Sequence, residues 1–144
     1  MTIFANKLDK LIIQLEELPI LADIVADEVM AKEFPAKVRH QIKEEGENDQ
    51  GQLIQEGYSN YWGTIRSVAG LQIEYVDLYY TGKFLDGLTT VESGDEYTLD
   101  SDVGYFQDLK DRYAGIMGLQ EDNLALIIED IRKKLIKEFR DGRR

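Results

Sequence analysis

Apolar residues at helical spacing occupy both ends of this chain, and they constrain its fold more than any other feature. In the N-terminal third they recur at steps of three and four, as an amphipathic helix requires: Phe4, Leu8, Leu11, Ile12, Leu15, Leu18, Leu21, Ile24, Val25 and Val29. A second stripe lies near the C-terminus: Leu124, Ile127, Ile128, Ile131, Leu135 and Phe139. The acidic residues Glu121 and Asp122 precede it, as is favoured in a first helical turn. Two long helices are therefore predicted.

Two prolines interrupt the first stripe. Proline lacks a backbone N–H and its ring clashes with the carbonyl four residues back, so Pro19 predicts a kink near Glu17 and Leu18, or a new helix with Pro19 in its first turn. Pro35 repeats the interruption, and residues 36–43 are expected to form a further short helical piece. Residues 1–43 are thus predicted to be a bent, amphipathic helical arm.

The middle of the chain changes character twice. Residues 44–58 open with a polar run that contains turn formers, which predicts an exposed loop that is mobile alone and ordered against a partner. Residues 58–78 are rich in aromatic and β-branched side chains, which predicts an extended segment with a strand near Gln72–Val76. Residues 59–101 are therefore expected to be the β-rich part.

A hairpin is the clearest feature of that part. Thr81-Gly82 is expected to open its first arm, which runs from Phe84 to Val91, and the return arm covers Glu96–Ser101. The joining turn, residues 93–95, contains a glycine that supplies the positive φ that tight hairpins need. A short helix over residues 105–113 and the C-terminal helix follow, so residues 105–140 are predicted to be helical. The expected class is α+β, with the terminal helix packed on the small antiparallel sheet.

Length and composition favour one domain, residues 1–144, that needs no disulfide or metal. Cysteine is absent, which excludes a disulfide framework and a thiolate zinc site. No signal peptide and no membrane span are expected, because charged residues interrupt every apolar run. No cofactor is predicted.

Charge is divided unevenly along the chain. Residues 132–144 carry seven basic side chains against Glu138 and Asp141, a local net charge of +5, whereas the other 131 residues carry −16 of the total of −11. The acidic body argues against specific nucleic-acid binding. The basic end has two interpretations: cations favoured at a helix C-terminus, or a tail that docks on an acidic neighbour.

Catalytic chemistry finds little support. His40 is the only histidine, lies beside Arg39 and is interpreted as a solvated surface residue, and no serine lies in a nucleophile-elbow motif. Four acids cluster around the hairpin but lack the glycine and terminal glutamate of a calcium loop: Asp95, Glu96, Asp100 and Asp102. The chain is therefore predicted not to be an enzyme.

An aromatic strip has two open interpretations, core packing or a protein–protein interface, for which Tyr and Trp are well suited. The strip consists of Tyr58, Tyr61, Trp62, Tyr75, Tyr79 and Tyr80. Combined with the basic end, it gives the candidate interface residues: Tyr58, Tyr61, Trp62, Lys133, Lys134, Lys137 and Arg140.

Read in order, residues 78–139 resemble a family of tailed-bacteriophage virion-morphogenesis proteins, the tail-completion or head–tail connector group, in particular versions from phages of Bacteroidetes hosts. The likeness is carried by the Thr-Gly entry at residues 78–84, the hairpin at residues 91–101, the short helix at residues 109–113 and Gly118-Leu119 before the closing helix. It implies a structural virion protein, assembled in the host bacterial cytoplasm, that forms a ring of its own copies and contacts other neck, portal or tail proteins.

Two other functions stay open at this point. An acidic inhibitor of the DNA-mimic type would use the −16 body as a decoy, and would need carboxylates arrayed on one face. A small adaptor would bind another protein through the helical arm.

Overall fold

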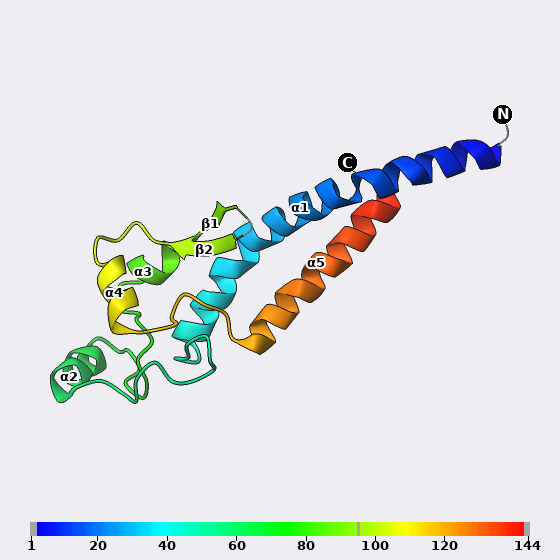
Figure 1. Cartoon of the computed structure of the whole chain (residues 1–144). Coiled ribbons are helices and arrows are strands. Elements are labelled where there is room, and N and C mark those ends of the chain that lie inside the picture. The colour runs from blue at the N-terminus through cyan, green and yellow to red at the C-terminus, as the bar shows by residue number, and fades with distance from the viewer. Residues whose placement is uncertain (1–2, 95, 143–144) are drawn as a thin grey trace.

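A computed structural model describes residues 3–94 and 96–142, with side chains from Glu16 onward. Its elements are α1 (Ile3–Lys43), α2 (Asn60–Val68), α3 (Lys83–Asp86), β1 (Thr89–Ser93), β2 (Glu96–Asp100), α4 (Phe106–Arg112) and α5 (Glu121–Asp141). The molecule is elongated: the N-terminal part of α1 projects past the end of α5, and the small elements gather around the other end of α1 (Figure 1). The α+β class predicted from the sequence is confirmed.

The helix α1 runs unbroken through Pro19 and Pro35. The prediction of a new helix or of separate pieces was therefore wrong, whereas the predicted bend is visible in Figure 1. A proline inside a helix costs about 3 kcal/mol. Burial offsets this cost around Pro35, because Phe34 and Val38 on either side of it are buried in the core.

Two strands form the whole sheet among the described residues. They pair antiparallel from Thr89↔Asp100 to Ser93↔Glu96. Gly94 has the predicted positive φ, 63°; Asp95 lies outside the described residues. The first arm is shorter than predicted, because residues 83–86 form the helical turn α3. Phe84 and Leu85 are both fully buried, which the side-to-side alternation of a half-exposed strand does not allow.

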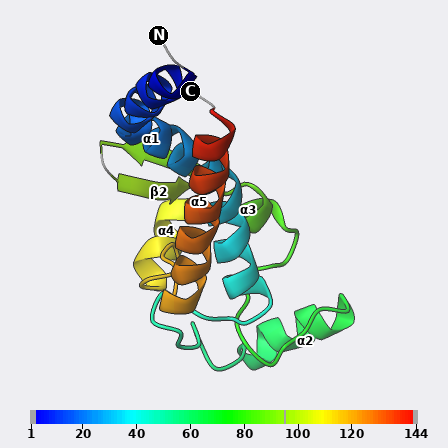
Figure 2. The same ribbon diagram turned by 90° about the vertical axis from the view of Figure 1, so that its right-hand side faces the viewer.

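The helix α5 packs antiparallel along α1, while the hairpin packs on α1 from another side (Figures 1 and 2). The prediction that the terminal helix packs on the sheet was therefore wrong. Leu99 is the only buried apolar side chain that the described strand residues offer, so the hairpin has too little apolar surface to hold a 21-residue helix. The core forms around α1 instead, with Val25, Ile42 and Ile127 almost completely buried.

Residues 44–59 form an irregular connection, as predicted, but parts of it are pinned to the core. The amide of Asp49 donates to the Gly115 carbonyl at 2.9 Å, and the Tyr75 hydroxyl donates to the Glu44 carbonyl at 2.7 Å. An isolated bridge joins Glu47 to Leu53. The tip of the loop, residues 50–53, is exposed.

The predicted strand near Gln72–Val76 does not form, and the part expected to be β-rich begins with a helix. Ser59 caps this helix, α2, by accepting a hydrogen bond from the Trp62 amide at 3.3 Å. Residues 71–82 then follow an irregular path. Side-chain hydrogen bonds, described below, take the place of strand pairing along this path.

Candidate functional site

A groove of about 900 Å³ lies between α2, the irregular segment 76–84 and the α4 region. Seven of its 18 lining residues are aromatic, and the rings come from separate stretches of the chain: Tyr58, Trp62, Tyr79, Tyr80, Phe84, Tyr105 and Tyr113. The groove therefore exists only in the folded chain. Its size lies within the usual range for ligand sites, about 300–1,000 Å³.

A buried ion pair supports the groove, which one of its members, Arg66, also lines. The Arg66 guanidinium contacts both carboxylate oxygens of Asp77, at 3.0 and 3.1 Å, and both side chains are almost completely buried. Its remaining nitrogens donate to the carbonyls of Gln72 at 3.0 Å and Tyr79 at 2.6 Å. Because one cation holds carbonyls at two points of segment 71–82, it fixes that segment against α2 without a strand.

Tyr58 completes this network. Its hydroxyl donates to Asp77 Oδ1 at 2.8 Å and accepts from the Asp77 amide at 2.9 Å, while the Arg66 guanidinium lies 4.3 Å from the centre of its ring. Burial raises the pKa of Tyr58 to about 12, so the phenol stays protonated and keeps donating at any physiological pH. The predicted interface residue Tyr58 is thus half-buried and structural as well as part of the groove wall.

Exposed aromatic side chains form the rim of the groove. Trp62 is 52% exposed, Tyr80 53% and Tyr105 47%. Tyr61 is 70% exposed and touches Trp62 edge-on, with ring centres 5.6 Å apart, but it does not line the groove. Of the three predicted aromatic interface residues, the structure therefore brings Tyr58 and Trp62 together and leaves Tyr61 outside.

The charge of the groove differs from that of the chain. Its lining includes Arg66, Lys83 and Arg112 and no carboxylate, although the chain has a net charge of −11. Within the described residues, Lys83 and Arg112 form no ion pair, whereas Arg66 is neutralised by Asp77. The rim is therefore locally positive.

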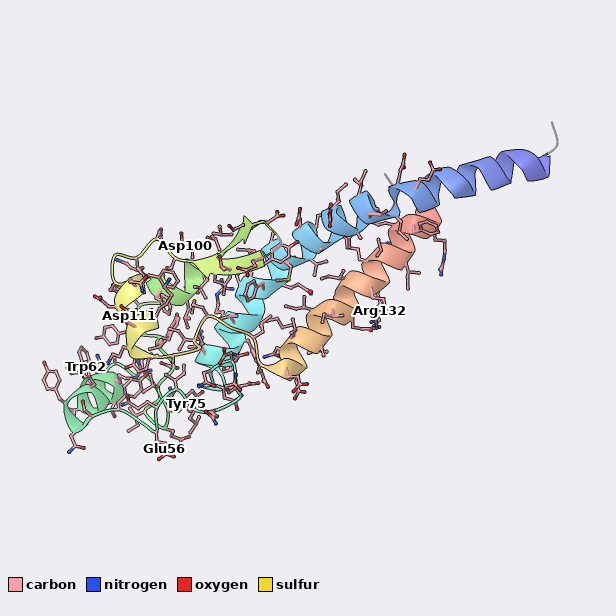
Figure 3. All side chains as sticks on the ribbon, in the orientation of Figure 1. Glu56, Trp62, Tyr75, Asp100, Asp111 and Arg132 are labelled. Atoms are coloured by element: carbon pink, nitrogen blue, oxygen red, sulfur yellow. The ribbon has the colours of Figure 1, made fainter. Side chains whose placement is uncertain are left out.

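The basic residues predicted to form an interface lie elsewhere, on α5. Lys133, Lys137 and Arg140 are exposed, whereas Lys134 pairs with Glu28 of α1 at 2.7 Å. Figure 3 shows Trp62 on α2 and Arg132 on α5 in well-separated parts of the molecule. The predicted interface residues thus belong to two surfaces, which we call the aromatic groove and the basic face (Lys133, Lys137 and Arg140).

Several residues that line the groove or support it were not predicted. Arg66 and Asp77 are ordinary charged residues 11 positions apart, and no local pattern marks them as a pair. Arg112 and Tyr113 end a short helix that the sequence did predict, but nothing indicated that this helix faces α2. Tyr75, although part of the predicted aromatic strip, packs over Gly46 instead.

The described residues give no group of acidic or histidine side chains arranged to hold a metal ion. His40 is exposed, with Nε2 3.7 Å from Glu45 Oε1. Neither long helix, over the residues described, carries an apolar stretch long and uncharged enough for a membrane crossing. Comparisons with protein families, with curated proteins and with solved structures found no match.

Proposed function

We propose that this protein is a structural component of a tailed-phage virion, present as several copies in a ring at the head–tail connector. The likeness of residues 78–139 to that family supports the proposal. The observation that carries it is that one chain exposes a basic face on α5 and carboxylates on α1 and β1. A subunit that contacts its neighbours through two different surfaces assembles head to tail, and such contacts form a ring when the rotation between successive copies closes.

The basic face has a charge complement on the same chain. Asp27 of α1 lies beside Asp23 and Glu92, and the charge of Asp27, with a smaller effect of Asp23, raises the pKa of the Glu92 carboxyl. We call these three residues the acidic patch. Glu92 and Asp23 are exposed, so cations of another copy have access to them. The basic face of one copy and the acidic patch of the next are therefore the proposed contact.

Removal of residues 132–144 is a poor test of this contact, because Leu135 and Phe139 pack against the core. Reversal of charge leaves that packing in place. We expect the wild-type chain to form oligomers as its concentration rises, seen by native mass spectrometry, and the variant Lys133→Glu/Lys137→Glu/Arg140→Glu to stay monomeric. Assembly of the variant at wild-type concentrations contradicts the proposed contact.

A second function, that of an adaptor, is favoured by the aromatic groove. An adaptor needs one surface for a partner and no self-assembly. A chain that remains monomeric at every concentration but binds a partner segment in the groove would support the adaptor and overturn the ring. Detection of the chain in purified virus particles would support the ring.

A further inference from the structure

The aromatic groove exposes side chains that proteins normally cover. Trp62, Tyr80 and Tyr105 come from α2, from the segment before α3 and from the residue before α4, and each is about half exposed. Burial of apolar area contributes about 25 cal/mol per Å², so a ligand that covers three exposed rings at one site would gain a large binding free energy. Exposed apolar patches that are rimmed by polar groups mark binding surfaces.

The groove is also held in one shape before any ligand arrives. The Arg66–Asp77 pair, the Tyr58 hydroxyl and the carbonyl of Tyr79 join α2 to the segment that carries Tyr80. Gly82 adds to this, because its φ of 86° turns the chain into α3. A preformed site loses less conformational entropy on binding, so the groove is suited to hold a flexible ligand.

Charge limits what that ligand is. Lys83 and Arg112 line the rim, are exposed and have no carboxylate beside them in the lining. A ligand with one or two carboxylates gains from both cations. A nucleic acid carries a phosphate at every nucleotide and would be repelled by the rest of the chain, which carries −16 outside residues 132–144. The rim thus favours a short acidic ligand over a polyanion.

Size and lining indicate a peptide. About 900 Å³ is large for a single small metabolite, and seven aromatic rings offer stacking and apolar contact along the groove. Aromatic-lined grooves on protein surfaces commonly hold extended segments of other proteins. Large side chains inserted between the rings would supply most of the affinity, and carboxylates near Lys83 and Arg112 would fix the direction of the segment.

We infer that the aromatic groove binds an extended segment of a partner protein in which a large apolar side chain lies next to one or two carboxylates. This inference does not depend on the ring, because the groove and the basic face are separate surfaces.

Selection from a library of random short peptides tests the inference without knowledge of the partner. We expect the wild-type chain to enrich peptides that combine an aromatic or leucine-type residue with Asp or Glu. The variant Lys83→Glu/Arg112→Glu is expected to enrich Lys or Arg in place of the acids, a gain that a misfolded chain cannot produce. No enrichment by the wild-type chain, or an unchanged preference in the variant, would overturn the inference.

Trp62 provides a direct reading of occupancy, because it is the only tryptophan in the chain and lies in the groove. An enriched peptide without tryptophan should shift the Trp62 emission as it binds. Trp62→Ala should weaken binding, followed by calorimetry, about tenfold or more, and the double charge reversal about fivefold to tenfold.

Two controls match these variants. Tyr61→Ala removes the neighbouring exposed ring that lies outside the groove, and Lys137→Glu reverses a cation on α5. Both should bind the peptide as the wild-type chain does. Equal losses in Tyr61→Ala and Trp62→Ala would contradict the site. A shift of Trp62 emission with the concentration of the protein alone, lost in Lys83→Glu/Arg112→Glu, would assign the groove to a second copy and overturn the inference.

Discussion

Arg66 shows how one side chain replaces a secondary-structure element. It is 3% exposed, and its guanidinium donates to Gln72, Asp77 and Tyr79 along an irregular segment. Asp77 in turn accepts from Tyr58, Gln72 and the Tyr79 amide. A buried ion pair is tolerated only when its remaining donors and acceptors are satisfied, and that condition is met here.

Replacement of Arg66 by Met should therefore be severe. It leaves the Asp77 carboxylate buried without its cation, so we expect a loss of about 3–5 kcal/mol in the free energy of unfolding, measured by urea denaturation. Arg132→Met is the matched control, because Arg132 forms an exposed pair with Glu129 at 2.8 Å and should lose less than about 1 kcal/mol. A loss for Arg66→Met as small as that expected for Arg132→Met would show that the buried network is unimportant.

Gly46 permits a close approach that no other residue allows. Its φ is +65°, and a Cβ atom at this position would collide with the ring of Tyr75, whose hydroxyl holds the end of α1. Gly46→Ala should cost about 2–4 kcal/mol, from the left-handed backbone and from the displaced ring. Gly70 has a similar φ, +76°, with open space around it, so Gly70→Ala should cost only about 1 kcal/mol. Thermal unfolding of both variants measures the two costs. A Gly70 variant as unstable as the Gly46 variant would refute the collision.

At the scale of elements, the sequence predicts helices well where one apolar periodicity continues over many residues. It predicts secondary structure poorly where contacts between residues distant in the sequence determine it. The stripes that end in Val29 and begin at Leu124 belong to α1 and α5, and Gly94 forms the hairpin turn as expected. Residues 58–78 were predicted to be extended because of their aromatic and β-branched content, yet the pairing of Arg66 with Asp77 and the Ser59 cap favour α2.

The same reasoning applies to the groove. Its aromatic residues are visible in the sequence, and the short helix that carries Arg112 was predicted, whereas α2 was predicted to be extended. Trp62 was named as an interface residue, but Tyr105 and Arg112 were not. These residues come together because of how α4 is placed across the groove from α2, and no short-range sequence pattern indicates that placement. The separation of Tyr58 and Trp62 from the basic residues of α5 likewise appears only in three dimensions.

The packing of α1 on α5 contains an acidic pair. Burial and the neighbouring carboxyl of Asp130 raise the pKa of Glu33, partly offset by Lys37 and Lys32. A carboxyl whose pKa is raised on folding destabilises the folded chain when ionised. Its contribution is therefore most favourable at low pH and is lost as pH rises through the folded pKa.

Glu33→Gln should accordingly stabilise the chain at neutral pH, by up to about 1 kcal/mol, and the gain should shrink as pH falls below that pKa. Urea denaturation of both chains across this pH range measures it. Glu56→Gln, at an exposed carboxyl in the loop, should show no comparable gain. A stabilisation by Glu33→Gln that increases as pH falls would be the opposite pH dependence and would refute a raised pKa of Glu33.

For the whole molecule, both the charge distribution and the elongated shape favour the proposed head-to-tail assembly. An acidic body, an acidic patch on α1 and β1 and a basic face on α5 give one chain exposed groups of opposite charge. Copies of a protein with net charge −11 repel one another in general, so association requires a contact in which opposite charges meet. That requirement gives the head-to-tail arrangement a direct test.

Sedimentation velocity of charge-reversed variants tests the proposed head-to-tail assembly directly. Reversal of the basic face alone (Lys133→Glu, Lys137→Glu and Arg140→Glu), or of the exposed part of the acidic patch alone (Asp23→Lys and Glu92→Lys), should abolish oligomers. The chain that carries both reversals should assemble again, because each contact then pairs opposite charges in the reverse sense. Assembly that is lost in the single-surface variants and restored in the combined one is the predicted result. Loss in all three, or in none, would contradict head-to-tail assembly through these surfaces.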